Sequence, residues 1–251
     1  MKLKHYLLSF LVFLKRGTFF PESMKTPVTR QRVFMNCSDE RAYKKIAIDF
    51  ARNRESTPMR FFRDHVSHLG QALCLDIGAN YGECFANADY GAAAVIAIEA
   101  NPLLLPYLEK TRSAHPDKDK IHLMNVLVAD KHKENVEFHY SETWSGGGSA
   151  AVKGNNSKRM SLPSQPLKDI IESAGCDRFD SLLLKIDVEG FEGRVLGPYL
   201  EELSNKRVAG IIEFDTEMLK AAGTDPQYFY ESLAECFHIF YTKRRSTELT
   251  R

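Results

Sequence analysis

Acidic residues stand directly after four apolar runs of the sequence, and their side chains are the ones best suited to chemistry. The four acids are Asp76, Glu99, Asp187 and Glu213. If the apolar runs are parallel strands of one open α/β sheet, their carboxyl ends lie along one edge and the carboxylates converge on a single crevice. A row of carboxylates repels phosphate, so the crevice suits a ligand that carries positive charge and hydroxyl groups.

The first of these acids begins a glycine-containing turn, D-I-G-A-N-Y-G at residues 76–82. Glycine lets the backbone approach a bound ligand without an intervening Cβ. The spacing from Asp76 to Glu99 fits an acid about 20 residues beyond such a loop that accepts from ribose hydroxyls. The phosphate-binding fingerprint G-x-G-x-x-G fails, because Glu83 stands where it needs glycine, and the sequence contains no G-x-x-x-x-G-K-[ST]. These residues favour a sulfonium cofactor over NAD.

Four sequence blocks together resemble the FkbM family of S-adenosylmethionine-dependent methyltransferases. They are D-I-G-A-N-Y-G at 76–82, I-E-A-N-P at 98–102, K-I-D-V-E-G at 185–190 and I-I-E-F at 211–214, in the order of the family. One departure is Ala100, where the family usually has proline. The resemblance implies a class I methyltransferase fold and O-methylation, often of sugars or of hydroxyls in secondary metabolites.

The resemblance also implies a set of residues that bind the cofactor. They are Asp76, Gly78, Asn80, Gly82, Glu99 and Asn101. In the family the glycine loop with its asparagine surrounds the methionine part of the cofactor, and the aspartate before it supports the loop. The glutamate binds the ribose, and the second asparagine flanks the adenine.

The candidate catalytic residues are Asp187, Lys185, Glu189 and Glu213. Asp187 is the first candidate for a base or a substrate-orienting group, because its strand ends beside the cofactor. Lys185 could keep Asp187 ionised, orient the substrate, act as the base if burial lowers its pKa, or form a structural ion pair with Asp187. Glu213 could instead cap the amides of the next turn, and Glu189 could belong to a helix-start turn. The three carboxylates could also bind a divalent metal ion, which we do not favour.

A doubly wound, mostly parallel α/β sheet is the fold that would position these residues. Apolar runs predict strands at 72–75, 92–98, 121–128, 181–186, 208–212 and 238–242. Helical patterns lie at 40–50, 59–69, 83–89, 103–111, 167–173, 194–203 and 226–236. Residues 136–140 alternate like an edge strand, and residues 145–149 resemble a flexible loop next to Trp144, the only tryptophan. This loop could be a substrate lid or a solvent-exposed hairpin loop. We expect the acceptor pocket to come from the loops around 140–165 and from the N-terminal segment.

Two domains are expected, a helical N-terminal extension with a connector at 1–55 and a methyltransferase domain at 56–251. The apolar run at 6–14 is far shorter than the roughly 20 residues that cross a bilayer. Residues 1–16 therefore predict a short amphipathic helix that docks on the core or contacts a membrane surface. The segment after the last predicted strand is short, which leaves the C-terminal edge of the sheet open to question.

The composition of the sequence indicates which cellular compartment and which binding partners to expect. The net charge of +1 gives no indication of a nucleic-acid partner, and five cysteines without C-x-x-C spacing are typical of a reducing cytoplasm. The sequence thus predicts a cytoplasmic, S-adenosylmethionine-dependent O-methyltransferase that acts on a small-molecule or glycan substrate. The alternatives are a Rossmann-type NAD-dependent oxidoreductase, and a non-catalytic cofactor-binding scaffold, which the short C-terminus favours.

Overall fold

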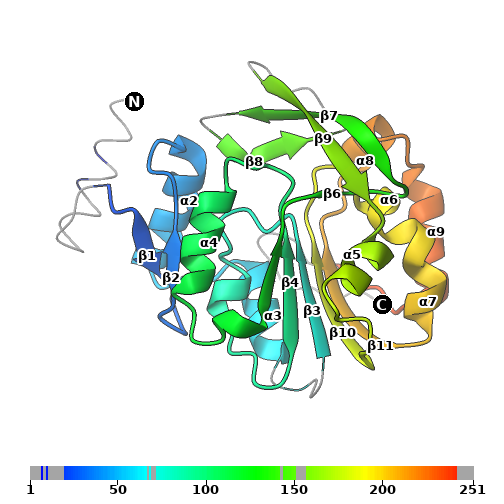
Figure 1. Cartoon of the computed structure of the whole chain (residues 1–251), viewed down its shortest axis with the longest axis horizontal. Coiled ribbons are helices and arrows are strands. Elements are labelled where there is room, and N and C mark those ends of the chain that lie inside the picture. Colours follow the sequence, from blue (N-terminus) through cyan, green and yellow to red (C-terminus); the bar gives the residue numbers. More distant parts are fainter. Residues whose placement is uncertain are drawn as a thin grey trace.

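A parallel sheet of five strands forms the centre of the molecule (Figure 1). The computed structural model describes residues 7, 10, 20–66, 68, 72–141, 144–150 and 157–241. In spatial order the strands are β11 (Arg207–Ile212), β10 (Ser181–Ile186), β3 (Ala72–Ile77), β4 (Ala94–Ile98) and β5 (Ile121–Met124). The chain winds outward from β3 in one direction and then returns to β10 on its other side, so the winding reverses between these two strands. The predicted doubly wound, mostly parallel sheet is confirmed.

Both faces of the sheet are covered, which explains why the central strands are mainly apolar. All six residues of β3 are buried. Leu73 and Leu75 belong to one hydrophobic cluster, whereas Ala72 and Cys74 belong to the other. This alternation follows from the two-residue period of a strand.

The N-terminal elements cover one face. They are the hairpin β1 (Ser23–Lys25) and β2 (Arg32–Phe34) with α2 (Glu40–Ala51) and α3 (Thr57–Val66), joined by α4 (Leu105–Ser113) and the short turn η2 (Lys118–Lys120). Met24 and Val33 of the hairpin share a hydrophobic cluster with Tyr81 and Phe85 of the predicted methyltransferase domain. The domain boundary after residue 55 stays a prediction.

The helix expected at 83–89 is wrong, because that segment contains only the single turn η1 (Phe85–Asn87). Its place on the sheet is taken by α3, which contacts η1, β10 and β11. A helix that precedes the first strand therefore covers the face that a crossover helix would otherwise cover.

Five helices cover the opposite face: α5 (Leu167–Ser173), α6 (Glu192–Leu196), α7 (Leu200–Ser204), α8 (Thr216–Ala221) and α9 (Pro226–Cys236). The single helix expected at 194–203 is wrong, since the turn η3 (Gly197–Tyr199) separates α6 from α7. Pro198 explains the interruption, because proline has no amide hydrogen for a helical hydrogen bond.

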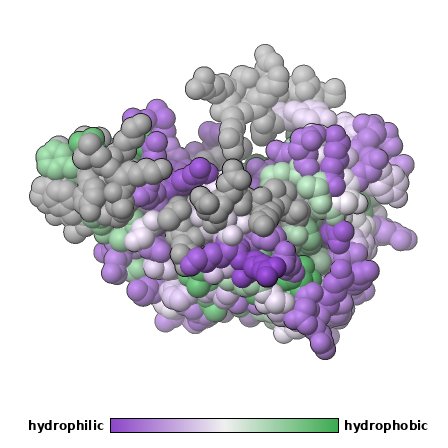
Figure 2. All heavy atoms as spheres, turned by 90° about the horizontal axis from the view of Figure 1, so that it is seen from above, coloured by the Kyte–Doolittle hydropathy of each residue, from purple (hydrophilic) through white to green (hydrophobic). Residues whose placement is uncertain are grey.

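A second sheet lies over the carboxyl ends of the central strands (Figure 1). Its order is β6 (Leu127–Val128), β9 (Lys158–Gln165), β7 (Lys133–Ser141) and β8 (Trp144–Ser149). The single strand expected at 121–128 is wrong, because its two halves belong to different sheets. The flexible loop expected at 145–149 is also wrong, since these residues pair with β7. Viewed from above this sheet, the visible surface is mainly hydrophilic (Figure 2).

The predicted sixth strand is wrong over residues 238–241, which form no strand, and Thr242 lies outside the described residues. Of residues 1–16 only Leu7 and Phe10 are described, and both are exposed. The predicted N-terminal helix and its membrane contact otherwise lie outside the described residues. Within the part of the chain that the structure describes, no helix has the length and apolar character needed to span a bilayer.

Candidate active site

A cavity of about 770 Å³ lies between the carboxyl ends of the central strands and the second sheet. Most of the predicted site residues line it, namely Gly78, Asn80, Glu99, Lys185, Asp187, Glu189 and Glu213. The other three, Asp76, Gly82 and Asn101, lie behind its wall and are buried. The sheet therefore gathers residues that are far apart in the sequence at the point where its winding reverses.

Gly78 lies at the closest approach of β3 and β10. Its φ is +78°, and a Cβ at this position would lie 1.9 Å from the backbone oxygen of Asp187. The amide of Asp187 in turn donates to the oxygen of Ile77 at 3.1 Å. Only glycine fits here, because any side chain would push the loop away from the turn that carries Asp187.

Glu99 holds the shape of the loop through two backbone amides. Its Oε2 accepts from the amide of Asn80 at 2.9 Å and its Oε1 from the amide of Asn101 at 2.8 Å. Burial raises the pKa of Glu99, while these amides act in the opposite direction. Asn80 has a φ of 52°, and its buried Oδ1 has no hydrogen-bond partner among the described residues. An orphaned acceptor on a cavity wall suits a ligand that carries a hydrogen-bond donor.

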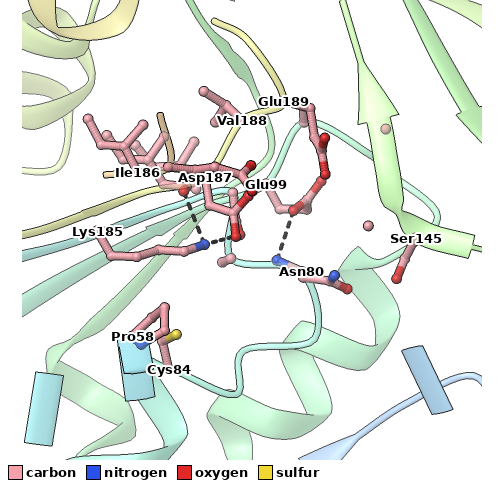
Figure 3. Close-up of a pocket in the computed structure, with 18 of the residues that line it drawn as sticks. Pro58, Asn80, Cys84, Glu99, Ser145, Lys185, Ile186, Asp187, Val188 and Glu189 are labelled. Atoms are coloured by element: carbon pink, nitrogen blue, oxygen red, sulfur yellow. Dashed lines mark hydrogen bonds between the residues drawn. The ribbon is translucent and has the colours of Figure 1, made fainter. Parts of the chain in front are cut away.

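Lys185 lies under the loop and ties it to the sheet (Figure 3). Its Nζ donates to the oxygens of Gly78 at 2.5 Å and Ile77 at 3.3 Å, and lies 3.4 Å from Oδ1 of Asp76. Burial acts to lower the pKa of Lys185, but the carboxylates of Asp76 and Asp187 outweigh it and raise the pKa. The side chain is therefore a cation at neutral pH, which disfavours it as a base. The ion pair that it forms is with Asp76 rather than with Asp187.

Three carboxylates meet on the wall of the cavity. Asp187, Glu189 and Glu213 each place an oxygen within 4.8 Å of the others. Burial, with a contribution from Asp187, raises the pKa of Glu189 to about 7 and that of Glu213 to about 8. The two glutamates can therefore hold protons near neutral pH, whereas an ordinary exposed glutamate is ionised there.

The turn that carries Asp187 and Glu189 is fixed from both sides. Oε1 of Glu192, which is buried, accepts from the amides of Val188 and Gly190. Gly190 has a φ of +106°, and a Cβ there would lie 2.6 Å from the oxygen of Met218 in α8. This agrees with the alternative interpretation, in which Glu189 belongs to a turn at the start of a helix and Gly190 permits close packing there.

The capping role considered for Glu213 belongs to a different residue. Asp215 accepts from the amides of Glu217 and Met218 at the start of α8. The side chain of Glu213 is therefore not the cap of this helix, and it remains on the cavity wall.

Two of the three predicted cofactor residues behind the cavity wall, Asn101 and Gly82, shape the backbone around the cavity. Oδ1 of Asn101 accepts from the amide of Leu103 in the turn that leads into α4. Gly82 has a φ of +82°, and a Cβ there would lie 2.4 Å from the ring of Phe85. Their predicted roles at the cofactor stay predictions.

Part of the cavity wall comes from outside the four blocks. It includes Lys45 and Asp49 of α2, Glu55, Phe138 of β7, and Trp144 and Ser145 of β8. The sequence led us to expect an acceptor pocket from loops around 140–165 and the N-terminal segment, with Trp144 in a substrate lid or in an exposed hairpin loop. It did not identify the residues of α2 that reach the cavity.

Comparisons with known proteins give a family match. A family model described as "Methyltransferase FkbM domain" matches residues 76–237. No curated protein matches the sequence.

Among solved structures, one match is a geranyl diphosphate methyltransferase in complex with GPP and sinefungin, at 9% identity and a TM-score of 0.41, covering 91% of this chain and 74% of the other. Another is geranyl diphosphate C-methyltransferase from Streptomyces coelicolor A3(2) in complex with Mg2+, geranyl-S-thiolodiphosphate and S-adenosyl-L-homocysteine. It has 10% identity and a TM-score of 0.41, and the match covers 94% of this chain and 76% of the other. Likenesses of this extent carry no information about the acceptor of this chain.

Proposed function

The chain belongs to the FkbM family of methyltransferases, and we propose that it transfers the methyl group of S-adenosylmethionine to a hydroxyl of a sugar, a glycan or a related hydroxylated metabolite. The main support for a hydroxyl acceptor is the carboxylate cluster of Asp187, Glu189 and Glu213 on the cavity wall. Methylation of a hydroxyl needs a group that accepts the hydroxyl proton, and a positioned carboxylate can do so.

The loop at residues 78–82 fits the methyl donor. Oδ1 of Asn80 is a buried acceptor without a partner among the described residues, which suits the ammonium group of the methionine part. Each oxygen of Glu99 accepts one amide hydrogen and has a second lone pair for a ribose hydroxyl. S-adenosylmethionine supplies a methyl group that its sulfonium has already activated. The protein therefore has to align the acceptor oxygen and accept its proton.

Asp187 is the base in this proposal, and the two neighbouring glutamates support it. Because the pKa values of Glu189 and Glu213 are raised to about 7 and about 8, part of the cluster is protonated at neutral pH. Fewer negative charges then surround Asp187. Lys185 is a positioning residue, since it holds the loop through two carbonyl oxygens.

The charge of the cavity wall favours an uncharged acceptor. Besides the cluster, the acids Asp49, Glu55 and Glu83 line the cavity, and Lys45 and Lys185 are the cationic residues among its described lining. A phosphate or carboxylate on the acceptor would meet a net negative wall. A neutral, hydroxyl-rich molecule meets hydrogen-bond acceptors without this repulsion.

Calorimetric titration tests the cofactor. We expect S-adenosylmethionine and S-adenosylhomocysteine to bind and NAD not to bind, because the loop fails the phosphate fingerprint. Binding of NAD alone would support an oxidoreductase instead. Binding of S-adenosylhomocysteine without methyl transfer to any acceptor tested would support a non-catalytic scaffold.

Methyl transfer from a labelled donor tests the acceptor class. The protein and the labelled donor are incubated with cell-envelope saccharide extracts, with Asp187→Asn as the inactive control. We expect the label in a methyl ether formed at a sugar hydroxyl, and such an ether survives mild alkali. Label in an alkali-labile ester or on nitrogen would contradict O-methylation of a hydroxyl.

The cytoplasmic location and the independence from a metal ion stay predictions. For the metal, addition of EDTA to this assay is expected to leave the rate unchanged.

A further inference from the structure

Asp39 connects three parts of the molecule that the sequence leaves unrelated. Its carboxylate is buried, with an exposed fraction of 2%. Oδ1 accepts from the amide of Ala42 and thereby caps α2. Oδ2 accepts from the hydroxyl of Tyr81 at 3.1 Å and from the amide of Ser145 at 2.8 Å. One carboxylate thus joins an N-terminal helix to the cofactor loop and to strand β8.

The link to the cofactor loop is rigid at the Tyr81 end. Tyr81 lies inside the predicted cofactor loop and is buried. Its backbone oxygen accepts from Oγ1 of Thr111 in α4. Burial and the neighbouring Asp39 raise the pKa of Tyr81, so the phenol keeps its proton and remains a donor. A movement of the loop therefore moves the hydroxyl that Asp39 holds.

The link to β8 reaches a second part of the cavity wall. Ser145 of β8 lines the cavity together with Asn80 of the cofactor loop (Figure 3). The guanidinium of Arg41 in α2 lies 4.3 Å from the ring centroid of Trp144, which provides a second contact between the same two elements. The ring of Trp144 covers the adjacent glycines, because a Cβ on Gly147 would lie 2.6 Å from it. Helix α2 therefore holds the strand that forms the roof of the cavity.

We propose that Asp39 is a positioning residue that couples the cofactor loop to β8, so that occupation of the loop sets the position of the roof over the acceptor. The proposal rests on the methyl-donor site and not on the identity of the acceptor. Oδ2 is shared between Tyr81 and Ser145, so a shift of one donor changes the geometry available to the other. Because both elements donate to the same buried oxygen, the position of one element restricts the positions that the other can take.

Trp144 allows a test without a known acceptor, because it is the only tryptophan of the chain. Its fluorescence and its quenching by acrylamide are measured with and without S-adenosylhomocysteine. We expect the ligand to lower the quenching of the wild type by about two-fold, since a positioned roof shields the ring.

Asp39→Asn is the decisive variant. Asparagine caps helices about as well as aspartate, so the cap at Ala42 persists while its amide nitrogen cannot accept from Tyr81 and Ser145. We expect S-adenosylhomocysteine to bind this variant within about five-fold of the wild-type affinity, and the change in Trp144 quenching to disappear. Tyr81→Phe removes one of the two donors and should reduce the change by about half.

Asp225→Asn is the matched control. Asp225 caps α9 through the amides of Gln227 and Tyr228. Its substitution should leave both ligand affinity and the Trp144 response unchanged. If Asp39→Asn unfolds, Tyr81→Phe decides the question, since it leaves the cap intact.

Three results would overturn the proposal: no response of Trp144 in the wild type that binds ligand, an unchanged response in Asp39→Asn, or an unchanged response in a folded Tyr81→Phe. Failure of the proposed function has a different signature. In that case the Trp144 response persists while no hydroxyl acceptor is methylated.

Discussion

The floor and the roof of the cavity are built in different ways. The floor consists of the carboxyl ends of β3, β4, β10 and β11 and of the residues that follow directly after these strands. The roof consists of β7 and β8 of the second sheet, held from the side by α2. On the floor, position follows from the register of parallel strands, such as Lys185 beside Asp76. On the roof, position depends on contacts such as that between Asp39 and Ser145, 106 residues apart.

This difference separates the groups that act on every acceptor from the groups that select a particular acceptor. The floor carries the groups that suit the methyl donor and the proton transfer, which are common to every acceptor. The roof and α2 supply the remaining wall, which we expect the acceptor to contact. Changes in the floor should therefore affect all acceptors alike, whereas changes in the roof should affect affinity for a particular acceptor.

The largest effect is expected at the floor from Asp187→Asn. An amide cannot accept the hydroxyl proton, so kcat should fall by about 10²–10⁴-fold. The affinity for S-adenosylhomocysteine should stay within a few-fold, as measured by calorimetry. Comparable loss of turnover and of ligand affinity would show that Asp187 holds the cofactor or the fold, and not the proton.

Gly78→Ala also changes the floor, but it should weaken the binding of S-adenosylhomocysteine. The new Cβ would lie 1.9 Å from the oxygen of Asp187, so the loop must move. Affinity for S-adenosylhomocysteine should fall by more than about ten-fold, since the loop and the turn can no longer meet. Gly175→Ala is the matched control, because Gly175 also has a positive φ, +67°, with nothing within 4 Å of the added Cβ. An equal loss in both variants would assign the effect to backbone strain alone.

Trp144→Ala tests the roof. Its ring packs over Gly147 and under Arg41, so its loss should loosen β8. With an acceptor found by the labelling assay, KM should rise by about ten-fold while kcat changes by less than about three-fold. The affinity for S-adenosylhomocysteine should stay within about five-fold of the wild-type value, because the roof is coupled to the cofactor loop. A collapse of kcat at unchanged KM would show that the roof takes part in catalysis, and the distinction between the two regions would fail.

The smallest effect concerns stability and pH at Glu213. Folding raises the pKa of Glu213 from 4.5 to about 8, so the native state favours the protonated form. Stability is then complete below the unfolded pKa and decreases as the pH rises toward 8. Glu213→Gln cannot ionise, and its Tm should exceed that of the wild type at pH 9 by about 2–4 °C but not at pH 4.5. Thermal unfolding followed by circular dichroism measures this, with the exposed Glu217→Gln as the control. A Tm difference that does not depend on pH would contradict a raised pKa.

The sequence predicted the floor well for a physical reason. A strand buried on both faces is mainly apolar, and it must end in a turn, so the apolar run from Ala72 and the turn at Gly78 are visible in the residue types. The same holds for β10 and the turn that begins at Asp187. Asp76, which the sequence placed after the strand, is the next-to-last residue of β3. Lys185 was another exception, because its residue type did not reveal that it reaches the loop carbonyls and pairs with Asp76.

The roof could not be predicted in this way. Residues 145–149 are glycine-rich, which resembles a flexible loop, and only the ring of Trp144 and the pairing with β7 make them a strand. The apolar run at 121–128 contains no sign that its halves enter different sheets. In the sequence Asp39 directly precedes the helical pattern at 40–50, and its contacts with Tyr81 and Ser145 come from residues that are distant in the sequence.

By itself, the sequence determined the family, the parallel sheet and the acids at the ends of its strands, because burial and turn geometry constrain residue types locally. Only the tertiary structure decided which carboxylates meet, what Lys185 holds and which segment covers the cavity. Those outcomes depend on contacts between distant segments, and many residue types at each position satisfy the local rules equally well.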